Sequence, residues 1–288
     1  MRVLMVFLAL ILPSCAGEGI APPQWGSPCD GWGTPKVVGR VADPGLTEIS
    51  GMVAGRVHPG ILWVHNDSDS APVLWAIDYT GTIRGSLELT NAEAFDWEAA
   101  SWGPGPGGGH LYVADTGDNL RSRPFAVLYR VAEPSDVAGA RRAAAEALRV
   151  TYPDGPRDVE AMFVDPATGD AYLIAKVLLG PAPVYRVPAA AWEAGEAQAE
   201  QVATLDLGLA PATAADVSFD GRVLAVRTYT AVLLLARPPG APAAAWFGAR
   251  PCRVPAPREA QGEAIAWDED GYLTIGEGVA SPIYRVSR

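Results

Sequence analysis

The sequence predicts an all-β protein, a five-bladed β-propeller whose last blade is completed by an N-terminal strand. Two observations lead to this prediction. Three kinds of short strand recur five times in the same order, and an acidic residue introduces the first strand of each repeat. Repeats of about 50 residues with three or four short strands are typical of propeller blades. A two-sheet sandwich is the alternative, but it does not explain the five matched acids.

The first strand of each repeat follows an acid, and the acids are spaced 50, 62, 56 and 47 residues apart. The strands are rich in β-branched and aromatic residues, and Gly, Pro or Asp bounds them. The introducing acids are Glu48, Glu98, Glu160, Asp216 and Glu263. The second strands are 62–66, 111–115, 172–176, 224–228 and 273–277. The third strands are 73–77, 127–131, 184–187, 232–236 and 283–286.

The last repeat ends soon after its third strand, so its fourth strand must come from elsewhere. Residues 36–41, which precede the first repeat, can supply it. This pairing closes the ring and removes an exposed sheet edge. The Ala-rich segment 138–148 is expected to form a short helical insertion between blades.

The first 14 residues resemble a secretory signal peptide. Arg2 precedes the apolar run 3–12, which is too short to span a bilayer, because a membrane helix needs about 20 residues. Residues 12–15 resemble a bacterial lipobox, in which the cysteine carries lipid. We therefore expect an exported lipoprotein that is anchored to a membrane through Cys15, at the outer membrane, in the periplasm or at the cell surface. An ordinary secretory signal is the alternative.

Two further cysteines remain, an even number that suits an oxidising compartment. Cys252 would lie on the outer strand of the fourth blade, and Cys29 just before the strand that completes the fifth. These positions are neighbours in the ring, which favours a disulfide over two free thiols. The expected organisation is a signal peptide 1–14, a lipidated tether 15–35 and one propeller domain 36–288. We expect this protein to be a monomer.

The start of each first strand should meet the end of the second strand near the axis of the propeller. The residues that close the second strands are Asn66, Asp115, Lys176, Arg227 or Thr228, and Glu277. Other polar residues expected at this level are His65, Asp67, Asp96, Asp118, Asn119, Arg157, Asp158, Tyr229 and Gln261. Like charges at close range raise one another's pKa, so the five introducing acids require a neutralising partner.

Two kinds of partner are possible. Lys176 and Arg227 would neutralise the acids from within the protein. The second kind of partner is a hard cation, Ca²⁺ in preference to Mg²⁺, because oxygen-rich clusters favour these ions. The five introducing acids would be its ligands. Zinc is disfavoured, because the three histidines are not spaced as a zinc pair. A solvent-filled channel whose acids pair with neighbouring Arg, Lys and amide groups is the alternative.

Residues 115–119, Asp-Thr-Gly-Asp-Asn, form a tight loop with several oxygen atoms. The loop is too short for an EF-hand, and an Asx turn is its structural interpretation. Its place after a channel-proximal strand favours a binding site, in which Arg121 and Arg123 would orient carboxylates or hold an anion. Two pairs of acids have i,i+2 spacing, Asp96 with Glu98 and Asp158 with Glu160. On a strand the two members of a pair face the same side, so each pair could supply two metal ligands, or one acid and one base.

Six motifs extend over about residues 46–280. They are Asp96-Trp97-Glu98; 112–119 with Arg121; Tyr129-Arg130-Val131; 152–155 with 158–161; 215–221 with 227–229; and 261–265. By these motifs the chain resembles a family of uncharacterised exported bacterial β-propeller proteins. The resemblance implies the fold and export, and it carries no activity to transfer. Ala114 and Thr116 stand where the family pattern has Gly and Ile.

Two classes of function follow. We favour a cell-envelope protein that binds a small molecule, glycan or protein. Its ligand-binding residues would be Asn66, Asp118, Asn119, Arg121, Tyr229 and Glu277. The alternative is a Ca²⁺-dependent hydrolase of phosphoesters or lactones, by analogy of fold with other propellers. Asp96 or Asp115 would then be the general base, and Lys176 and Arg227 would bind an anionic group. The net charge of −11 argues against a nucleic-acid ligand.

Overall fold

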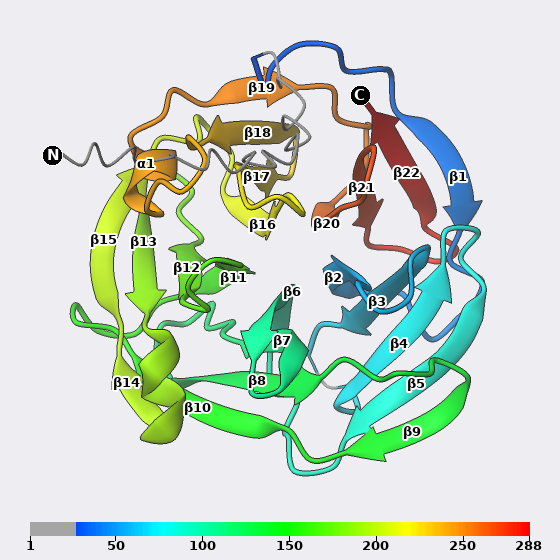
Figure 1. The fold of residues 1–288 in the computed structure, drawn as a ribbon, viewed down its shortest axis with the longest axis horizontal. Helices are drawn as coiled ribbons and strands as arrows, with labels where there is room; N and C mark the ends of the chain where they lie inside the picture. The colour runs from blue at the N-terminus through cyan, green and yellow to red at the C-terminus, as the bar shows by residue number, and fades with distance from the viewer. Residues whose placement is uncertain (1–26, 69) are drawn as a thin grey trace, which may run out of the picture.

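A computed structural model describes residues 27–68 and 70–288 and contains five sheets arranged around a central axis (Figure 1). This arrangement confirms the predicted five-bladed β-propeller. The innermost strand of each blade contacts the innermost strands of both neighbouring blades, so the ring is closed. The predicted signal peptide and Cys15 lie outside the described residues.

Each blade is a sheet whose four main strands are antiparallel. Blade 1 contains β2 (Ile49–Ala54), β3 (Ile61–Asn66), β4 (Val73–Asp78) and β5 (Ile83–Leu89). Blade 2 contains β6 (Trp97–Gly105), β7 (Gly108–Asp115), β8 (Ala126–Ala132) and β10 (Glu146–Thr151). Blade 3 contains β11 (Val159–Val164), β12 (Ala171–Ala175), β13 (Ala182–Val187) and β15 (Glu200–Leu205). Blade 4 contains β16 (Ala212–Val217), β17 (Val223–Thr228), β18 (Ala231–Ala236) and β19 (Cys252–Val254).

Blade 5 joins the two ends of the described chain. It contains β20 (Gly262–Trp267), β21 (Gly271–Gly276), β22 (Pro282–Ser287) and the N-terminal strand β1 (Lys36–Arg40). Lys36 lies opposite Arg285 in the antiparallel pairing of β1 with β22, which confirms the predicted closure. The predicted disulfide is also confirmed: the Cα atoms of Cys29 and Cys252 are 5.6 Å apart. It ties the chain before β1 to the outer strand of blade 4.

The segment 138–148 is not helical, so the expected insertion is wrong. It contributes β9 (Gly139–Ala143), which runs parallel to β5, and the start of β10. Leu148 and Val150 are buried while their neighbours in β10 are exposed. Burial that alternates with a period of two is typical of a strand, although the alanines favour a helix.

Helix is confined to short segments of the described chain. They are the 3₁₀ helix η1 (Ala189–Glu193), which leads into β14 (Glu196–Gln198), and α1 (Ala244–Phe247). None of the helices in residues 27–288 is long and apolar enough to cross a membrane.

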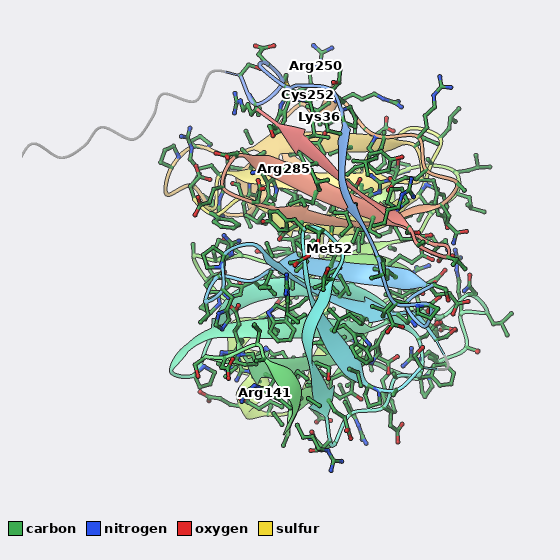
Figure 2. All side chains as sticks on the ribbon, turned by 90° about the vertical axis from the view of Figure 1, so that its right-hand side faces the viewer. Lys36, Met52, Arg141, Arg250, Cys252 and Arg285 are labelled. Carbon is green, nitrogen blue, oxygen red and sulfur yellow. A yellow bond between two sulfur atoms is a disulfide. The ribbon has the colours of Figure 1, made fainter. Side chains whose placement is uncertain are left out.

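The hydrophobic core consists of five clusters, one between each pair of neighbouring blades. Both faces of a blade are therefore buried, which explains why the innermost strands are buried along almost their whole length. Met52 of β2 lies near the middle of the side view, and Arg141 of β9 lies at its lower edge (Figure 2). The buried Met52 thus lies in the interior of the ring, whereas Arg141 is on the strand at the outer edge of blade 1.

Candidate functional site

A β-bulge recurs at the start of the innermost strand of every blade. The pairing with the second strand shifts between residues 49 and 51, 97 and 99, 159 and 161, 212 and 214, and 262 and 264. Bulges re-aim side chains, and these five lie at one level of the channel. The unpaired residues are Ser50, Glu98, Glu160, Thr213 and Glu263.

Only three of the five introducing acids are therefore at structurally equivalent positions, and the expected equivalence does not hold for Glu48 and Asp216. Glu48 precedes the bulge and is exposed. Asp216 lies beyond the bulge, deeper in the fold. Its carboxylate accepts hydrogen bonds from the backbone N–H groups of Val217 (2.8 Å) and Trp267 (2.7 Å), so it serves the packing of blade 4 against blade 5.

Five carboxylates from blades 1 to 3 form what we call the acidic cluster. Oxygen atoms of Asp67, Asp96 and Glu98 lie within 4.8 Å of one another, and so do those of Glu98, Asp158 and Glu160. Glu98 belongs to both groups, and Glu98, Asp158 and Glu160 are buried. The two i,i+2 pairs are thus brought together at one site. Carboxylate oxygens grouped in this way can serve as ligands of a hard cation.

The loop 115–119 covers the acidic cluster. The N–H of Asp118 donates to Oδ1 of Asp158 (2.9 Å), and the Thr116 hydroxyl donates to the carbonyl of Val159 (2.7 Å). A Cβ atom at Gly117 would lie 2.3 Å from Oδ2 of Asp96 and 2.5 Å from Oε1 of Glu98. Only glycine leaves room for these two carboxylates beneath the loop.

The two acids of that loop form hydrogen bonds and an ion pair with neighbouring residues of the chain. Asp115 accepts a hydrogen bond from the N–H of Asp96 (3.1 Å) and pairs with Arg123 (2.8 Å). Asp118 accepts from the N–H groups of Ser122 (2.8 Å) and Arg123 (2.9 Å). The Asx-turn interpretation therefore fits better than the predicted catalytic and binding roles. After Asp118 in the sequence, two predicted ligand-binding residues are exposed, Asn119 and Arg121.

The two predicted basic partners have different positions. Lys176 forms an ion pair with Glu160, and its Nζ lies 5.9 Å from the ring centroid of Tyr229. Burial opposes the charge of Lys176, but the contact with Glu160 raises its pKa. Arg227 is instead buried between blades 4 and 5, where it pairs with Glu259. It is therefore not placed to bind an anionic ligand at the channel mouth.

Burial and mutual repulsion raise the pKa values of the acidic cluster. Burial, then the charges of Glu160 and Asp67, raises the pKa of Glu98 to about 10. Burial raises the pKa of Glu160 to about 8 even though Lys176 opposes the shift. Burial and the hydrogen bond with Asp67 raise the pKa of Asp96 to about 7. At neutral pH the cluster therefore retains protons unless a cation replaces them.

Other predicted site residues lie around the cluster. Glu263 is buried, and burial raises its pKa while Gln261 donates a hydrogen bond to it. Glu277 is half-buried, and after burial the charges of Glu263 and Glu48 raise its pKa. Asn66 is engaged elsewhere, since its amide donates to the carbonyl of Gly45 (2.7 Å). Glu263 and Glu277 thus extend the negative field of the channel mouth.

Comparisons with known proteins give no family. No protein-family description matches the sequence, and no curated protein matches it. Raptor from Chaetomium thermophilum is 10% identical with a TM-score of 0.44, over 85% of this chain and 20% of Raptor. A chain of a nidogen–laminin complex is 10% identical with a TM-score of 0.47, over 80% of this chain and 73% of the other. The chain spans about a fifth of Raptor, and neither likeness bears on function.

Proposed function

We propose that this protein is a cell-envelope lipoprotein whose acidic cluster binds a divalent cation, preferably Ca²⁺. The ion in turn holds a small-molecule, glycan or protein ligand at the channel mouth. The N-terminal sequence supports export and anchoring. The acidic cluster supports the cation.

One observation carries the cation proposal. Glu98, Asp158 and Glu160 are buried with oxygens within 4.8 Å of one another, and Oε2 of Glu160 has no hydrogen-bond partner among the described residues. A buried, unpaired carboxylate oxygen is costly, and a bound cation would remove that cost. Oxygen-only donors favour Ca²⁺, which takes about six to eight ligands. Coordination positions that the cluster does not fill are available to ligand oxygens.

Calorimetric titration with Ca²⁺ tests the proposal. Binding must displace the protons held by Glu98 and Glu160, whose pKa values are raised to about 10 and about 8. We therefore expect affinity to rise between about pH 6 and 8.5, and the apparent enthalpy to vary with the ionisation enthalpy of the buffer. Absence of binding at millimolar Ca²⁺ would exclude the proposal.

Matched variants locate the ion. Glu98→Gln removes a carboxylate shared by both groups of the cluster and should weaken Ca²⁺ binding by more than about tenfold. Glu196→Gln makes the same chemical change on the exposed strand β14 and should leave affinity unchanged. Equal effects of the two substitutions would place the ion outside the acidic cluster.

A Ca²⁺-dependent hydrolase is the second candidate, and one feature of Asp96 favours it. Asp96 is half-buried, and its pKa of about 7 suits a general base at neutral pH. In a screen of phosphoesters and lactones with Ca²⁺ present, the rate should fall by about 100-fold in Asp96→Asn. Because the bound ion lowers the pKa of Asp96, the rate should rise with pH at a midpoint below about 7. Activity that Asp96→Asn retains in full would remove Asp96 from the mechanism.

A further inference from the structure

A cavity lies at the other end of β20 from the acidic cluster. Glu263 stands at the start of this strand, and Trp267, at its end, lines the cavity. The cavity has a volume of about 310 Å³. Its walls are the β16–β17 loop, the β20–β21 turn and the N-terminal segment before β1. It is therefore separate from the cation site proposed above.

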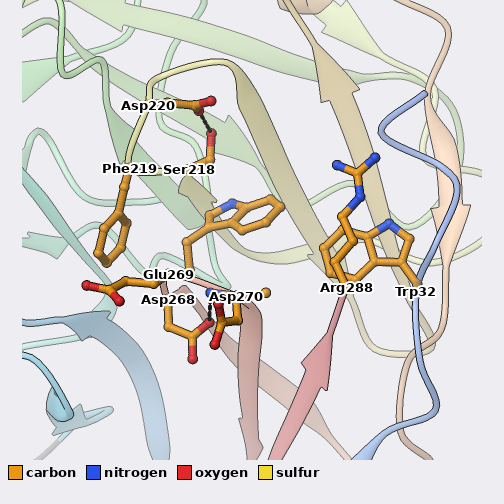
Figure 3. Close-up of a pocket in the computed structure, with 10 residues that line it drawn as sticks. Trp32, Ser218, Phe219, Asp220, Asp268, Glu269, Asp270 and Arg288 are labelled. Carbon is orange, nitrogen blue, oxygen red and sulfur yellow. Dashed lines mark hydrogen bonds between the residues drawn. The ribbon is translucent and has the colours of Figure 1, made fainter. Parts of the chain in front are cut away.

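The cavity has aromatic walls on several sides. Phe219 and Trp32 line it from opposite sides of the close-up (Figure 3). The ring centroid of Trp32 lies 6.0 Å from that of the buried Trp267 and 5.1 Å from that of Tyr272. Phe219 is 41% exposed, a large fraction for an aromatic ring. The negative π-faces of such rings attract cations.

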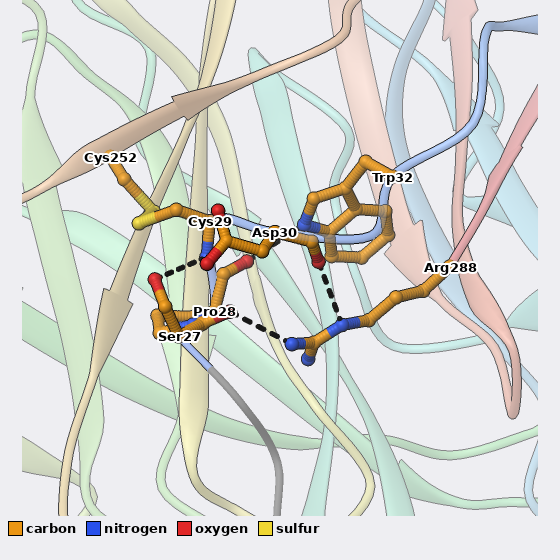
Figure 4. The surroundings of a disulfide bond; sticks show 7 residues. All are labelled: Ser27, Pro28, Cys29, Asp30, Trp32, Cys252 and Arg288. Carbon is orange, nitrogen blue, oxygen red and sulfur yellow. Dashed lines mark hydrogen bonds between the residues drawn. A yellow bond between two sulfur atoms is a disulfide. The ribbon is translucent and has the colours of Figure 1, made fainter.

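Trp32 is held in place by contacts that do not involve a ligand. Its indole N–H donates to the carbonyl of Pro28 (2.7 Å). The Arg288 guanidinium donates to the carbonyls of Asp30 (3.2 Å) and Ser27 (2.8 Å), beside the Cys29–Cys252 disulfide (Figure 4). The Trp32 wall of the cavity is thus preformed, which lowers the entropic cost of binding.

The charge of the cavity is negative. Four acids line it against the single base Arg288, and they are Asp220, Asp268, Glu269 and Asp270. Asp268 pairs with Arg285 (2.7 Å), and Asp220 accepts a hydrogen bond from the Ser218 hydroxyl (2.6 Å). Glu269 is exposed, and its carboxylate has no hydrogen bond or ion pair within the described residues. Glu269 is therefore the charge most available to a ligand.

Phe219 already serves as a cation platform within the protein. The Cζ atom of Arg56 lies 3.1 Å from the Phe219 ring centroid, and Arg56 lines the adjacent cavity. The cavity at Trp267 offers the same kind of contact to a ligand. Aromatic walls with an available carboxylate favour a cation that carries apolar groups, and a volume of this size suits a small one. We propose that this cavity binds a small organic ammonium ion, with its charged head at Phe219 and Glu269 and its apolar part toward Trp32, whose ring already lies beside the Arg288 guanidinium.

Choline and its neutral isostere 3,3-dimethylbutan-1-ol test the proposal, because they share a shape and differ in charge. Calorimetry on the intact oxidised protein should give a dissociation constant on the order of millimolar for choline, and about tenfold weaker binding for the alcohol. Equal affinities would show an apolar or sugar-type pocket and overturn the proposal. So would the absence of choline binding at about 100 mM.

Variants show where choline binds. Glu269→Gln and Phe219→Leu should each weaken choline binding by about fivefold. Glu269 and Phe219 are exposed, so both variants are expected to fold. Glu98→Gln and the surface control Glu196→Gln should leave choline binding unchanged. A loss of choline binding in Glu98→Gln that matches the loss in Glu269→Gln would assign the ammonium to the acidic cluster and overturn the proposal.

Discussion

Glu98 is the residue on which the acidic cluster depends, because both groups of carboxylates include it. Its side chain reaches the channel mouth from a bulge between Trp97 and Ala99. A bulge adds one residue to one strand, and sequence spacing does not reveal such a shift. For this reason the sequence pattern matched Asp216 with Glu98 and Glu160, although Asp216 lies elsewhere in the fold. Asp158 was expected in an i,i+2 pair with Glu160, whereas Asp67 was recognised only as a polar residue at the same level.

Gly117→Ala tests the packing of the loop on the cluster. The backbone of Gly117 does not have a positive φ, so it can adopt an alanine conformation. The new Cβ would displace the carboxylates of Asp96 and Glu98. We expect Ca²⁺ affinity to fall about 10- to 100-fold in calorimetry. Gly248→Ala is the control, because its Cβ would make only an ordinary contact at 3.7 Å. Unchanged affinity in Gly117→Ala would argue against the cluster.

Asp115→Asn distinguishes structural support from catalysis. The substitution removes the charge that faces Arg123 and weakens the bond to the N–H of Asp96. We expect a loss of about 1–3 kcal/mol in the free energy of unfolding, measured by urea denaturation. Cation affinity should fall far less than in Glu98→Gln. A stable Asp115→Asn protein that loses a measured hydrolase activity would instead support the predicted role as base.

At the scale of elements, the strands were predictable because each is short, apolar and bounded by turn residues. The closure by β1 and the disulfide followed from the order of the strands, and both are present. The strands formed by the segment 138–148 were not predictable from its composition, because its alanines favour a helix. The alternation of buried and exposed residues becomes evident only when Leu148 and Val150 pack in the core between blades 2 and 3. Tertiary packing overrode helix propensity there.

The Cys29–Cys252 disulfide should stabilise the ring closure. It links residues 223 positions apart, so it restricts the unfolded chain strongly. We expect reduction to lower the free energy of unfolding by about 2–4 kcal/mol, measured with denaturant in the presence and absence of reductant. The Cys29→Ser/Cys252→Ser double variant should match the reduced protein and show no effect of reductant. A wild-type protein insensitive to reduction would contradict this role.

For the molecule as a whole, the acidic cluster makes stability depend on pH. Glu98 has a folded-state pKa of about 10 against an ordinary value of 4.5, and Glu160 about 8 against 4.5. The folded state therefore binds more protons than the unfolded state between those values. Stability without divalent cations should fall as pH rises through this window. The −11 net charge adds a general repulsion.

Calcium should reverse that dependence. Because Ca²⁺ binds the deprotonated cluster of the folded state, it should raise Tm more at pH 8.5 than at pH 6. Thermal unfolding in excess Ca²⁺ and in chelator, across this range, measures the difference. Glu98→Gln should show a flatter pH profile in chelator and a smaller Ca²⁺ effect. A Tm that Ca²⁺ raises equally at both pH values would contradict proton displacement from these carboxylates.

A crystal structure of the protein grown with Ca²⁺ would show whether a cation sits among Glu98, Asp158 and Glu160. Anomalous scattering identifies the ion independently of the chain. We predict a single strong peak at the channel mouth, with carboxylate oxygens of all three residues about 2.3–2.6 Å away. Ordered side chains at this position without an anomalous peak, or a peak at another place, would exclude a cation site among these three residues.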